Sequence, residues 1–407
     1  MNYRPEATGI GPYTAGLAEH LAEQGHDVVV STTFPHYPQW SWQQTAGRWP
    51  RTETLNGVEV RRMRVILPRR PRARWRIVYD SSFAAAAFLN TALVGRRDVV
   101  VCVTPPIQAA FTGAVLARRW RAPLILLVKD LPLEAALSVG MLRPGGGYRF
   151  GEWLEKKAYD LADVIVVINK RFERVLTRQG VPSDKVVVIP DWVDVEQIGL
   201  GSPDVDIREL LGSSNGDFVV LHCGSMGAKQ GLSVAVRAAQ IAGENSRIRL
   251  ALVGDGPQKP LLEQMVAQGG ISNVRLLPLQ SVSVFGHMLS TADALLVNQI
   301  AGVVDSVMPS KLLAYMAAGR PIVAAANPES VAAQVVREAG CGVVVRPEDP
   351  EALANAMRAL SRDDEGRREL GLAGRRFVEL HFERKAILKQ WVSLISETAC
   401  MGVRRSG

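Results

Sequence analysis

The chain has 407 residues with a formal net charge of +8, and 47% of its residues are hydrophobic and 22% charged, which is typical of a globular protein long enough for two domains. No apolar run reaches the roughly 18–20 residues that span a bilayer, and the polar first residues do not predict a signal peptide. The four cysteines are far apart and form no CxxC pair, which indicates buried, reduced thiols in a cytoplasmic protein.

Strand-like and helix-like segments alternate along nearly the whole chain. A helix is predicted at Pro12–Gln24, where Gly25 ends the apolar periodicity. The β-branched runs predict parallel sheets in an α/β architecture, because helical segments separate them. The predicted strands are Val28–Thr32, Val99–Val103, Leu124–Val128, Val164–Ile168, Val186–Ile189, Phe218–Cys223, Ile248–Val253, Val274–Leu277, Ala294–Val297, Pro321–Ala325 and Gly342–Val345.

A Pro- and Gly-rich stretch at Pro190–Pro203 is the predicted linker between two doubly wound, Rossmann-like domains. We therefore place an N-terminal domain at residues 1–194 and a C-terminal domain at residues 195–380. The carboxyl ends of their strands, where ligands bind, are expected to face a central cleft. Met1 already lies in what resembles the loop after a first strand. Either residues upstream of Met1 that form this strand have been lost, or the N-terminal sheet is incomplete. We favour loss, because a sheet with an unfilled central position would leave backbone groups unpaired.

Three Gly-rich turns are candidates for binding phosphate, because glycine lets the backbone approach a ligand closely. Gly9-Ile10-Gly11 opens the first helix, although an ordinary loop-to-helix turn is the more common explanation. The turn after Phe218–Cys223 carries Lys229, so its amides and one ammonium can hold a diphosphate; the alternative is a βα loop with a surface lysine. In Gly254-Asp255-Gly256 the aspartate can simply cap the next helix. None has the GxGxxG or Walker spacing, so nicotinamide cofactors are not indicated.

The segment Pro309–Gly319 predicts a helix whose N-terminus binds an anion. Ser310 is a natural N-cap, and Gly319 is suited to end the helix. The free amides of the first turn carry partial positive charge. Lys311 in that turn conflicts with this charge unless an anion is bound, which favours a phosphate site.

Two further side chains directly follow predicted strands and are expected at the ligand-binding edge. Asp130 comes after Leu124–Val128 and is a candidate to contact sugar hydroxyls or to act as a base. His36 follows Val28–Thr32 and can bind substrate or transfer protons, although a lone histidine is more often structural.

Eight arginines lie between Arg61 and Arg76, interleaved with apolar residues and Trp75. Such a segment binds an anionic membrane surface or nucleic acid, or is a solvated arginine-rich loop. No nucleic-acid-binding motif accompanies it, so a membrane surface is favoured over nucleic acid.

Taken in order, these motifs resemble the retaining family 4 glycosyltransferases, in particular the branch that makes exopolysaccharides such as colanic acid. The resemblance runs over nearly the whole chain and includes TTFPHYPQW, VIPDWVD, GSMGAKQGL, LVGDGP and PSKLLAYMAAGRPIVAA. It implies the GT-B fold, with a helix at residues 381–407 that crosses back to the N-terminal domain. It also implies retaining, metal-independent transfer from a UDP- or GDP-linked sugar to a lipid-linked glycan at the inner face of the cell membrane, with no separate cofactor.

The residues and the resemblance together give one candidate site. Its implied catalytic residues are Asp130, Lys229 and Lys311. By the resemblance, the loop after Val274–Leu277 receives the base, and the amides from Ser310 onward close on the diphosphate. The implied substrate-binding positions are Gly9, Ile10, Gly11, His36, Gly224, Ser225, Gly227, Gly254, Leu277, Asp305, Pro309, Ser310 and Leu312.

The chain departs from the family pattern at several of these positions. Ser225 stands where many members carry arginine, and Lys129 stands where many carry histidine. Ser306 and Ala314 stand where most carry two glutamates that contact the donor sugar and its ribose. Two alternatives therefore stay open: a GT-B epimerase acting on UDP-N-acetylhexosamine, and a catalytically inert GT-B scaffold in a polysaccharide assembly complex.

Overall fold

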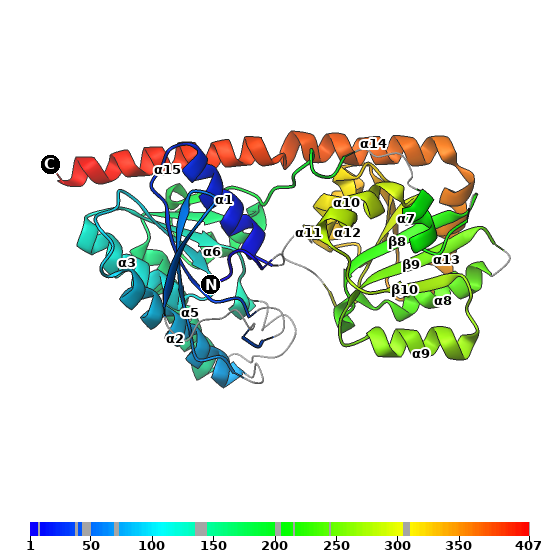
Figure 1. Cartoon of the computed structure of the whole chain (residues 1–407), viewed down its shortest axis with the longest axis horizontal. Coiled ribbons are helices and arrows are strands. Elements are labelled where there is room, and N and C mark those ends of the chain that lie inside the picture. The colour runs from blue at the N-terminus through cyan, green and yellow to red at the C-terminus, as the bar shows by residue number, and fades with distance from the viewer. Residues whose placement is uncertain are drawn as a thin grey trace. The chain divides into compact units, whose positions relative to one another are not determined.

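A computed structural model describes residues 1–6, 9–36, 40–42, 50–68, 73–134, 145–199, 205–214, 216–243, 246–303 and 310–406. The chain divides into two compact units (Figure 1). Unit 1 comprises Met1–Asp191 and Lys385–Gly407, and unit 2 comprises Trp192–Arg384. The predicted boundary after Asp194 and the observed boundary after Asp191 both fall in the Pro190–Pro203 stretch.

Unit 1 contains two sheets. Four parallel strands lie in the order of the chain, and β5 is buried along its whole length, which explains its continuous apolar sequence. The second sheet has the order β1-β3-β2, with β1 parallel and β2 antiparallel to β3. The strands are β1 (Val29–Thr33), β2 (Arg51–Leu55), β3 (Val58–Met63), β4 (Val100–Thr104), β5 (Leu124–Val128), β6 (Val164–Val167) and β7 (Val186–Val188).

The β2–β3 hairpin is absent from the predicted elements. Its turn is Asn56-Gly57, and both residues have positive φ, of 50° and 79°. This is the two-residue turn that matches the twist of paired strands. The hairpin places Arg61 and Arg62 inside β3, so the first part of the predicted basic segment is a strand.

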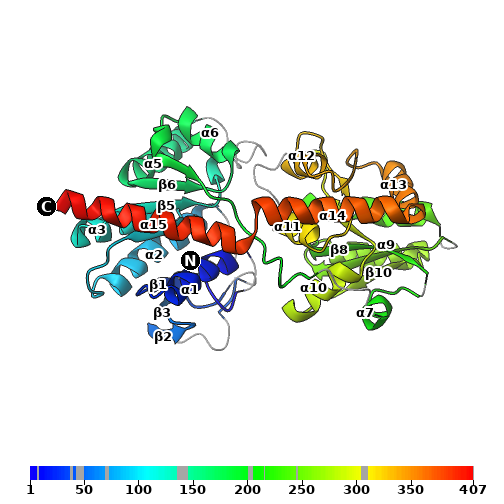
Figure 2. The same cartoon turned by 90° about the horizontal axis from the view of Figure 1, so that it is seen from above.

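Helices cover both sides of the strands in unit 1. The helices α2, α3 and α5 lie on one side, and α1 and α15 lie on the other (Figures 1 and 2). None of the helices in the described residues is both long enough and apolar enough to cross a membrane. The helices are α1 (Gly11–Glu23), α2 (Ala73–Thr91), α3 (Gln108–Trp120), α5 (Gly146–Leu161), α6 (Lys170–Arg178) and α15 (Arg384–Ser406), of which α15 begins at the boundary of unit 2.

Unit 2 is one parallel sheet in the order β10-β9-β8-β11-β12-β13. The first strand lies in the middle and the order reverses between β8 and β11, so ligands are expected at the carboxyl ends of these two strands. The predicted parallel α/β architecture of both units is confirmed. The strands are β8 (Phe218–Ser225), β9 (Ile248–Asp255), β10 (Val274–Leu277), β11 (Ala294–Asn298), β12 (Ile322–Ala325) and β13 (Gly342–Val345).

Alternate residues of β8 contribute to two different hydrophobic clusters. Val219 and Leu221 belong to the cluster that includes α11 and α12, whereas Phe218 and Val220 belong to the cluster that includes α8 and α13. Such a strand is buried on both faces, as in a doubly wound fold. The helices are α7 (Val205–Leu210), α8 (Ser233–Ala242), α9 (Lys259–Gly269), α10 (Val282–Thr291), α11 (Ser310–Ala317), α12 (Val331–Glu338), α13 (Pro350–Arg362) and α14 (Asp364–His381).

All four cysteines are free thiols, as expected from their spacing. Cys223 and Cys341 are buried and Cys102 is partly buried. Cys400, in contrast, is exposed on α15, so the expectation of burial is wrong for this residue.

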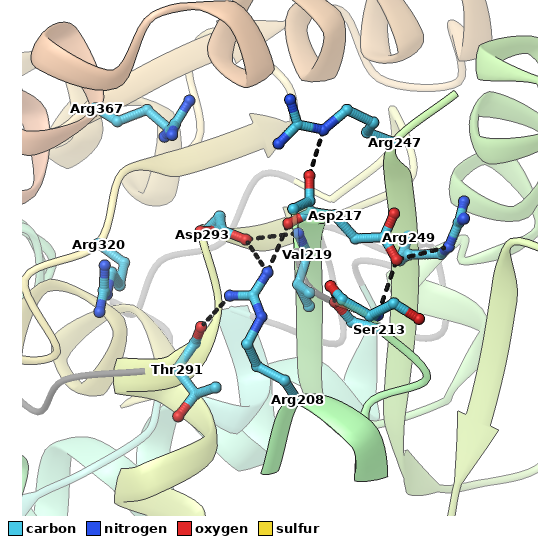
Figure 3. A network of polar contacts seen from close by, with 12 residues as sticks. Arg208, Ser213, Asp217, Val219, Arg247, Arg249, Thr291, Asp293, Arg320 and Arg367 are labelled. Atoms are coloured by element: carbon cyan, nitrogen blue, oxygen red, sulfur yellow. Dashed lines mark hydrogen bonds and ion pairs between the residues drawn. The ribbon is translucent and has the colours of Figure 1, made fainter. Parts of the chain in front are cut away.

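A polar network closes the amino-terminal edge of the unit 2 sheet (Figure 3). Asp293, just before β11, accepts hydrogen bonds from the Val219 amide at 2.8 Å and from the Arg208 guanidinium at 3.2 Å. Arg208 also donates to the carbonyl of Thr291 at 3.4 Å. These contacts hold β8 and β11 together at the edge opposite the expected ligand site.

We predict that Asp293→Ala lowers the free energy of unfolding by about 2–4 kcal/mol, because it leaves a strand amide and a half-buried guanidinium without their shared acceptor. Urea denaturation followed by circular dichroism measures this loss. Asp364→Ala is the control, because that carboxylate is 88% exposed in its ion pair with Arg367 and should contribute less than about 1 kcal/mol. Equal losses in the two variants would contradict the role of Asp293.

Candidate active site

Tyr315 fixes the first turns of α11 beside the carboxyl end of β8. Its buried hydroxyl accepts a hydrogen bond from the Cys223 amide at 2.7 Å and donates one to the Cys223 carbonyl at 3.1 Å. Burial raises the pKa of Tyr315, so the hydroxyl keeps its proton. One turn earlier, Lys311 lies next to Gly224, since a Cβ atom built on this glycine would be 3.7 Å from the Lys311 Nζ.

Main-chain packing joins the Gly-rich turns after β8 and β9. The Met226 amide donates to the Asp255 carbonyl at 2.8 Å, and the Gln258 amide donates to the Met226 carbonyl at 3.0 Å. Gly254 has a φ of +156°, and a Cβ atom there would lie 1.8 Å from the Gly224 carbonyl oxygen. Only glycine allows the two turns to approach this closely.

The turn that carries Lys229 is held by the end of β11. Lys229 is exposed in the short helix η2 (Ala228–Gln230), and its carbonyl accepts from the Ile300 amide at 3.0 Å. The buried Asn298 side chain donates to the carbonyls of Gln230 at 2.6 Å and Gly231 at 3.0 Å. The sequence analysis does not single out Asn298; an amide at the end of an apolar strand is the feature that could have indicated it.

His222 is a second residue of this site that sequence reasoning missed. Its ring is fully buried, with Nδ1 3.3 Å from the Leu296 carbonyl and Nε2 3.4 Å from the Ser225 carbonyl. Burial, together with the nearby Lys311 ammonium, lowers the pKa of His222 to about 3. The imidazole is therefore neutral at physiological pH, and the lysines carry the positive charge of this edge.

The remaining predicted donor-side positions differ in what they offer a ligand. Ser225 is exposed at the end of β8, and Gly227 is partly buried beside it. Leu277 and Leu312 are buried, so these two positions can contact a ligand only through the backbone or the adjoining loop. Ala314 is buried one turn into α11. Asp305, Ser306 and Pro309 lie outside the described residues, as does the side chain of Ser310.

In unit 1, a buried charge pair lies at the carboxyl edge of the four-stranded sheet. Lys129 directly follows β5, and its ammonium forms an ion pair with Asp191 and lies 4.5 Å from the centroid of the Tyr13 ring. The Lys129 side chain is only 6% exposed. Tyr13 belongs to the first turn of α1, so this group joins α1, β5 and the segment after β7. Its members are too distant in sequence to be recognised as one group, although a lysine directly after a fully apolar strand was an available signal.

The other predicted residues of unit 1 surround this edge. Gly9, with φ +66°, and Ile10 precede α1, whose N-terminus has no side-chain cap. A Cβ atom on Gly11 would lie 2.7 Å from the Glu6 carbonyl oxygen. Asp130 is exposed, and its Oδ1 accepts from the Leu131 amide at 2.8 Å, which fixes a turn.

His36 is buried and does not face solvent. Its Nε2 is 2.6 Å from the Tyr79 hydroxyl and its Nδ1 is 3.0 Å from the Phe34 carbonyl, so an Nδ1–H tautomer satisfies both nitrogens. Burial lowers the pKa of His36, which favours this neutral form. Both ring nitrogens are engaged and the residue connects β1 to α2, which favours a structural role. Contact of His36 with substrate stays a prediction.

The arginines of the predicted membrane-binding segment are largely paired. Arg62 is buried and forms an ion pair with Glu53, while Arg61 pairs with Glu59 at 2.6 Å. Arg76 pairs with Asp80 at 3.2 Å. Arg64 lies over the Trp42 ring at 5.4 Å from its centroid.

Four further arginines of the segment are only partly described or not described. Arg69, Arg70 and Arg72 and the side chain of Arg74 lie outside the described residues. The described part of Arg61–Arg76 is therefore not the continuous cationic surface that the sequence suggested.

Comparisons with known proteins agree with this fold. Residues 8–192 match the glycosyl transferase 4-like domain, and residues 205–377 match the glycosyl transferases group 1. WcaI of Escherichia coli (strain K12), whose name assigns it to colanic acid biosynthesis as a glycosyl transferase, is 30% identical over 403 residues, which cover 97% of each chain.

Two solved structures share the fold. Sucrose-phosphate synthase from Thermosynechococcus elongatus has a TM-score of 0.73 at 21% identity, covering 96% of this chain and 94% of that chain. Anabaena Alr3699/HepE in complex with UDP-glucose has a TM-score of 0.60 at 19% identity, covering 80% of this chain and 84% of that chain. The two parallel-sheet units and these similarities define a glycosyltransferase of the GT-B fold. Within that class, the chain belongs to family 4, and it is related to enzymes of polysaccharide biosynthesis.

We predict that Gly254→Ala lowers the free energy of unfolding by about 3 kcal/mol or more and weakens UDP binding, because its Cβ forces the two Gly-rich turns apart. Gly243→Ala is a matched control: Gly243 also has positive φ, of +91°, but no atom lies within 4 Å of an added Cβ. Gly243→Ala should lower the free energy of unfolding by only about 1 kcal/mol and leave UDP binding unchanged. Thermal denaturation and calorimetric titration with UDP measure both effects. A Gly254→Ala protein as stable as the control would refute the close approach of the turns.

Proposed function

We propose that this glycosyltransferase moves a sugar, with retention of configuration, from a UDP- or GDP-linked donor to a lipid-linked glycan in exopolysaccharide synthesis. The observation that carries the proposal is the placement of Lys311 beside Gly224, at the carboxyl edge where the strand order of unit 2 reverses. The similarity to WcaI supports the polysaccharide context, and the fold shared with the UDP-glucose complex of Alr3699/HepE supports the donor class.

The chemistry centres on the departing nucleoside diphosphate. As the bond between the anomeric carbon and the diphosphate oxygen breaks, negative charge grows on that oxygen. Lys311, the amides at the start of α11 and the exposed Lys229 supply positive charge for it. We infer that these groups make the reaction independent of a metal ion. The acceptor hydroxyl attacks the same face of the sugar and gives its proton to the leaving diphosphate, so the configuration is retained.

We assign the acceptor to unit 1. Lys129 and Asp191 form a buried pair at its carboxyl edge, and Asp130 is exposed next to them. The exposed carboxylate of Asp130 is suited to bind sugar hydroxyls and to orient the attacking one, and the Lys129–Asp191 pair holds the segments beside it in place. Since the proposed acceptor carries a lipid, we place the protein on the inner face of the cell membrane, in contact with the cytoplasm.

One observation favours a second candidate, a catalytically inert scaffold. By the family resemblance, Ala314 and Ser225 stand in place of a ribose-binding glutamate and a diphosphate-binding arginine, and Ala314 is buried. Titration with UDP and GDP separates the two proposals, because a scaffold without donor function binds neither nucleotide. An epimerase would instead invert one carbon centre of the sugar of UDP-N-acetylhexosamine without an acceptor.

We predict that Lys311→Ala lowers kcat/KM for transfer by about 100-fold, as expected for the loss of a charge that stabilises the leaving group. Lys311→Arg should restore part of this rate, because it keeps the charge. Lys389→Ala, at an exposed position of α15, is the control and should not change it. Initial rates with a panel of nucleotide sugars measure the effect. Transfer that survives Lys311→Ala within a few-fold would show that α11 does not hold the diphosphate.

A further inference from the structure

The outward side of α2, α3 and α5 is unusually apolar for a water-facing surface. The helix α3 contacts both α2 and α5, so the three form one layer on the side of unit 1 away from α15 (Figures 1 and 2). We call the outward side of this layer the α2–α3–α5 face. Among its exposed side chains, Leu89 is 73% and Phe150 63% exposed. Its exposed large apolar residues include Ile77, Phe88, Leu89, Val115, Phe150 and Trp153.

The helix α5 has the composition of a helix at a membrane interface. Phe150 and Trp153 stack on each other, with ring centroids 5.8 Å apart, although both are exposed. Arg149, Lys156 and Lys157 are exposed at helical spacings of three, four and seven residues from these rings, so they lie on the same side. Aromatic rings flanked by long cationic side chains are typical of helices that lie in the headgroup region of a bilayer.

The exposed charges of the face are mostly positive, although the carboxylate of Glu152 is partly exposed beside the aromatic pair. Among the described side chains of the three helices, the exposed cations are Arg118, Arg119, Arg149, Lys156 and Lys157, and the one exposed carboxylate is Asp160, which pairs with Lys156 at 3.5 Å. After Asp80, α2 contains no charged residue at all. A groove of about 490 Å³ between α2 and α3 is lined by Phe88, Phe111 and Val115.

These features favour an anionic lipid surface over a second copy of the chain. A symmetric dimer through this face would bring the same cations toward each other with fewer carboxylates than cations to match them. An anionic bilayer offers opposite charge to the cations and an apolar phase to the rings.

We propose that the α2–α3–α5 face docks on the surface of an anionic lipid bilayer, with Phe150 and Trp153 at the level of the headgroups. This rests on the proposed function, in which the acceptor carries a lipid. The helix α5 follows the loop after β5, so its aromatic end lies toward the carboxyl edge where Lys129 and Asp191 form their pair. The docked bilayer would therefore lie on the side of unit 1 from which a lipid-linked acceptor reaches that pair.

The test is co-sedimentation of the full chain with vesicles of phosphatidylcholine alone and of phosphatidylcholine mixed with phosphatidylglycerol. The protein should bind the mixed vesicles more tightly, and added salt should weaken this binding. Phe150→Ser with Trp153→Ser should lower partitioning by about tenfold or more on both compositions. Lys156→Gln with Lys157→Gln should lower it only on the mixed vesicles, by about tenfold.

The control is Leu261→Ser with Leu380→Ser, which removes two apolar side chains of unit 2 that are 48% and 77% exposed. It should bind vesicles like the unaltered protein, and an equal loss in the control would overturn the proposal. The proposal would also be overturned if the unaltered protein bound UDP but did not bind vesicles. Self-association that the aromatic variant abolishes, without vesicle binding, would identify the face as a subunit interface instead. Failure of the unaltered protein to bind UDP or GDP would count against the proposed function, whatever the vesicles show.

Discussion

The two hydrogen bonds between Tyr315 and the main chain of Cys223 are the constraint on which the donor end of unit 2 depends. A parallel sheet alone fixes only where β8 ends. The position of α11 relative to that end requires a specific contact, and a buried hydroxyl that both accepts and donates provides one. Because the hydroxyl lies out of water, its loss would leave the Cys223 amide unpaired. Lys311 reaches Gly224 as a consequence of this contact.

The strands were predictable from sequence because a strand buried on both faces is a nearly continuous run of apolar residues. This holds for β5 and β8, whose residues are nearly all buried. It fails for β2, where charged and threonine residues alternate and half of the strand is exposed. There the Asn56-Gly57 turn was the stronger indication of a hairpin. The arginines of β3 suggested a basic loop because their partner Glu53 lies on the neighbouring strand, outside any local pattern.

The same difference between local patterns and contacts made far along the chain separates the site residues that the sequence indicated from those that it did not. Glycines of strand-to-helix turns were identified because their requirement is local: a positive φ or a close backbone contact. His222, Asn298 and Lys129 act through partners far along the chain, so no spacing in the sequence indicates them. The structural contact of His36 was not apparent from sequence for the same reason, since its partner Tyr79 lies on α2. The roles of Asp305 and Pro309 stay predictions.

The alanine at position 314 is understandable in terms of the charges around it. Residues three apart on a helix face each other, so a glutamate there would stand one turn from Lys311 and pair with its ammonium. Alanine leaves that turn without a carboxylate, and His222 beside it is neutral because burial lowers its pKa. A lysine in the first turn of a helix is unfavourable near the helix dipole. In the proposed function a diphosphate adds negative charge at this end, and Lys311 and Ala314 together would suit a site that binds the phosphates more strongly than the ribose.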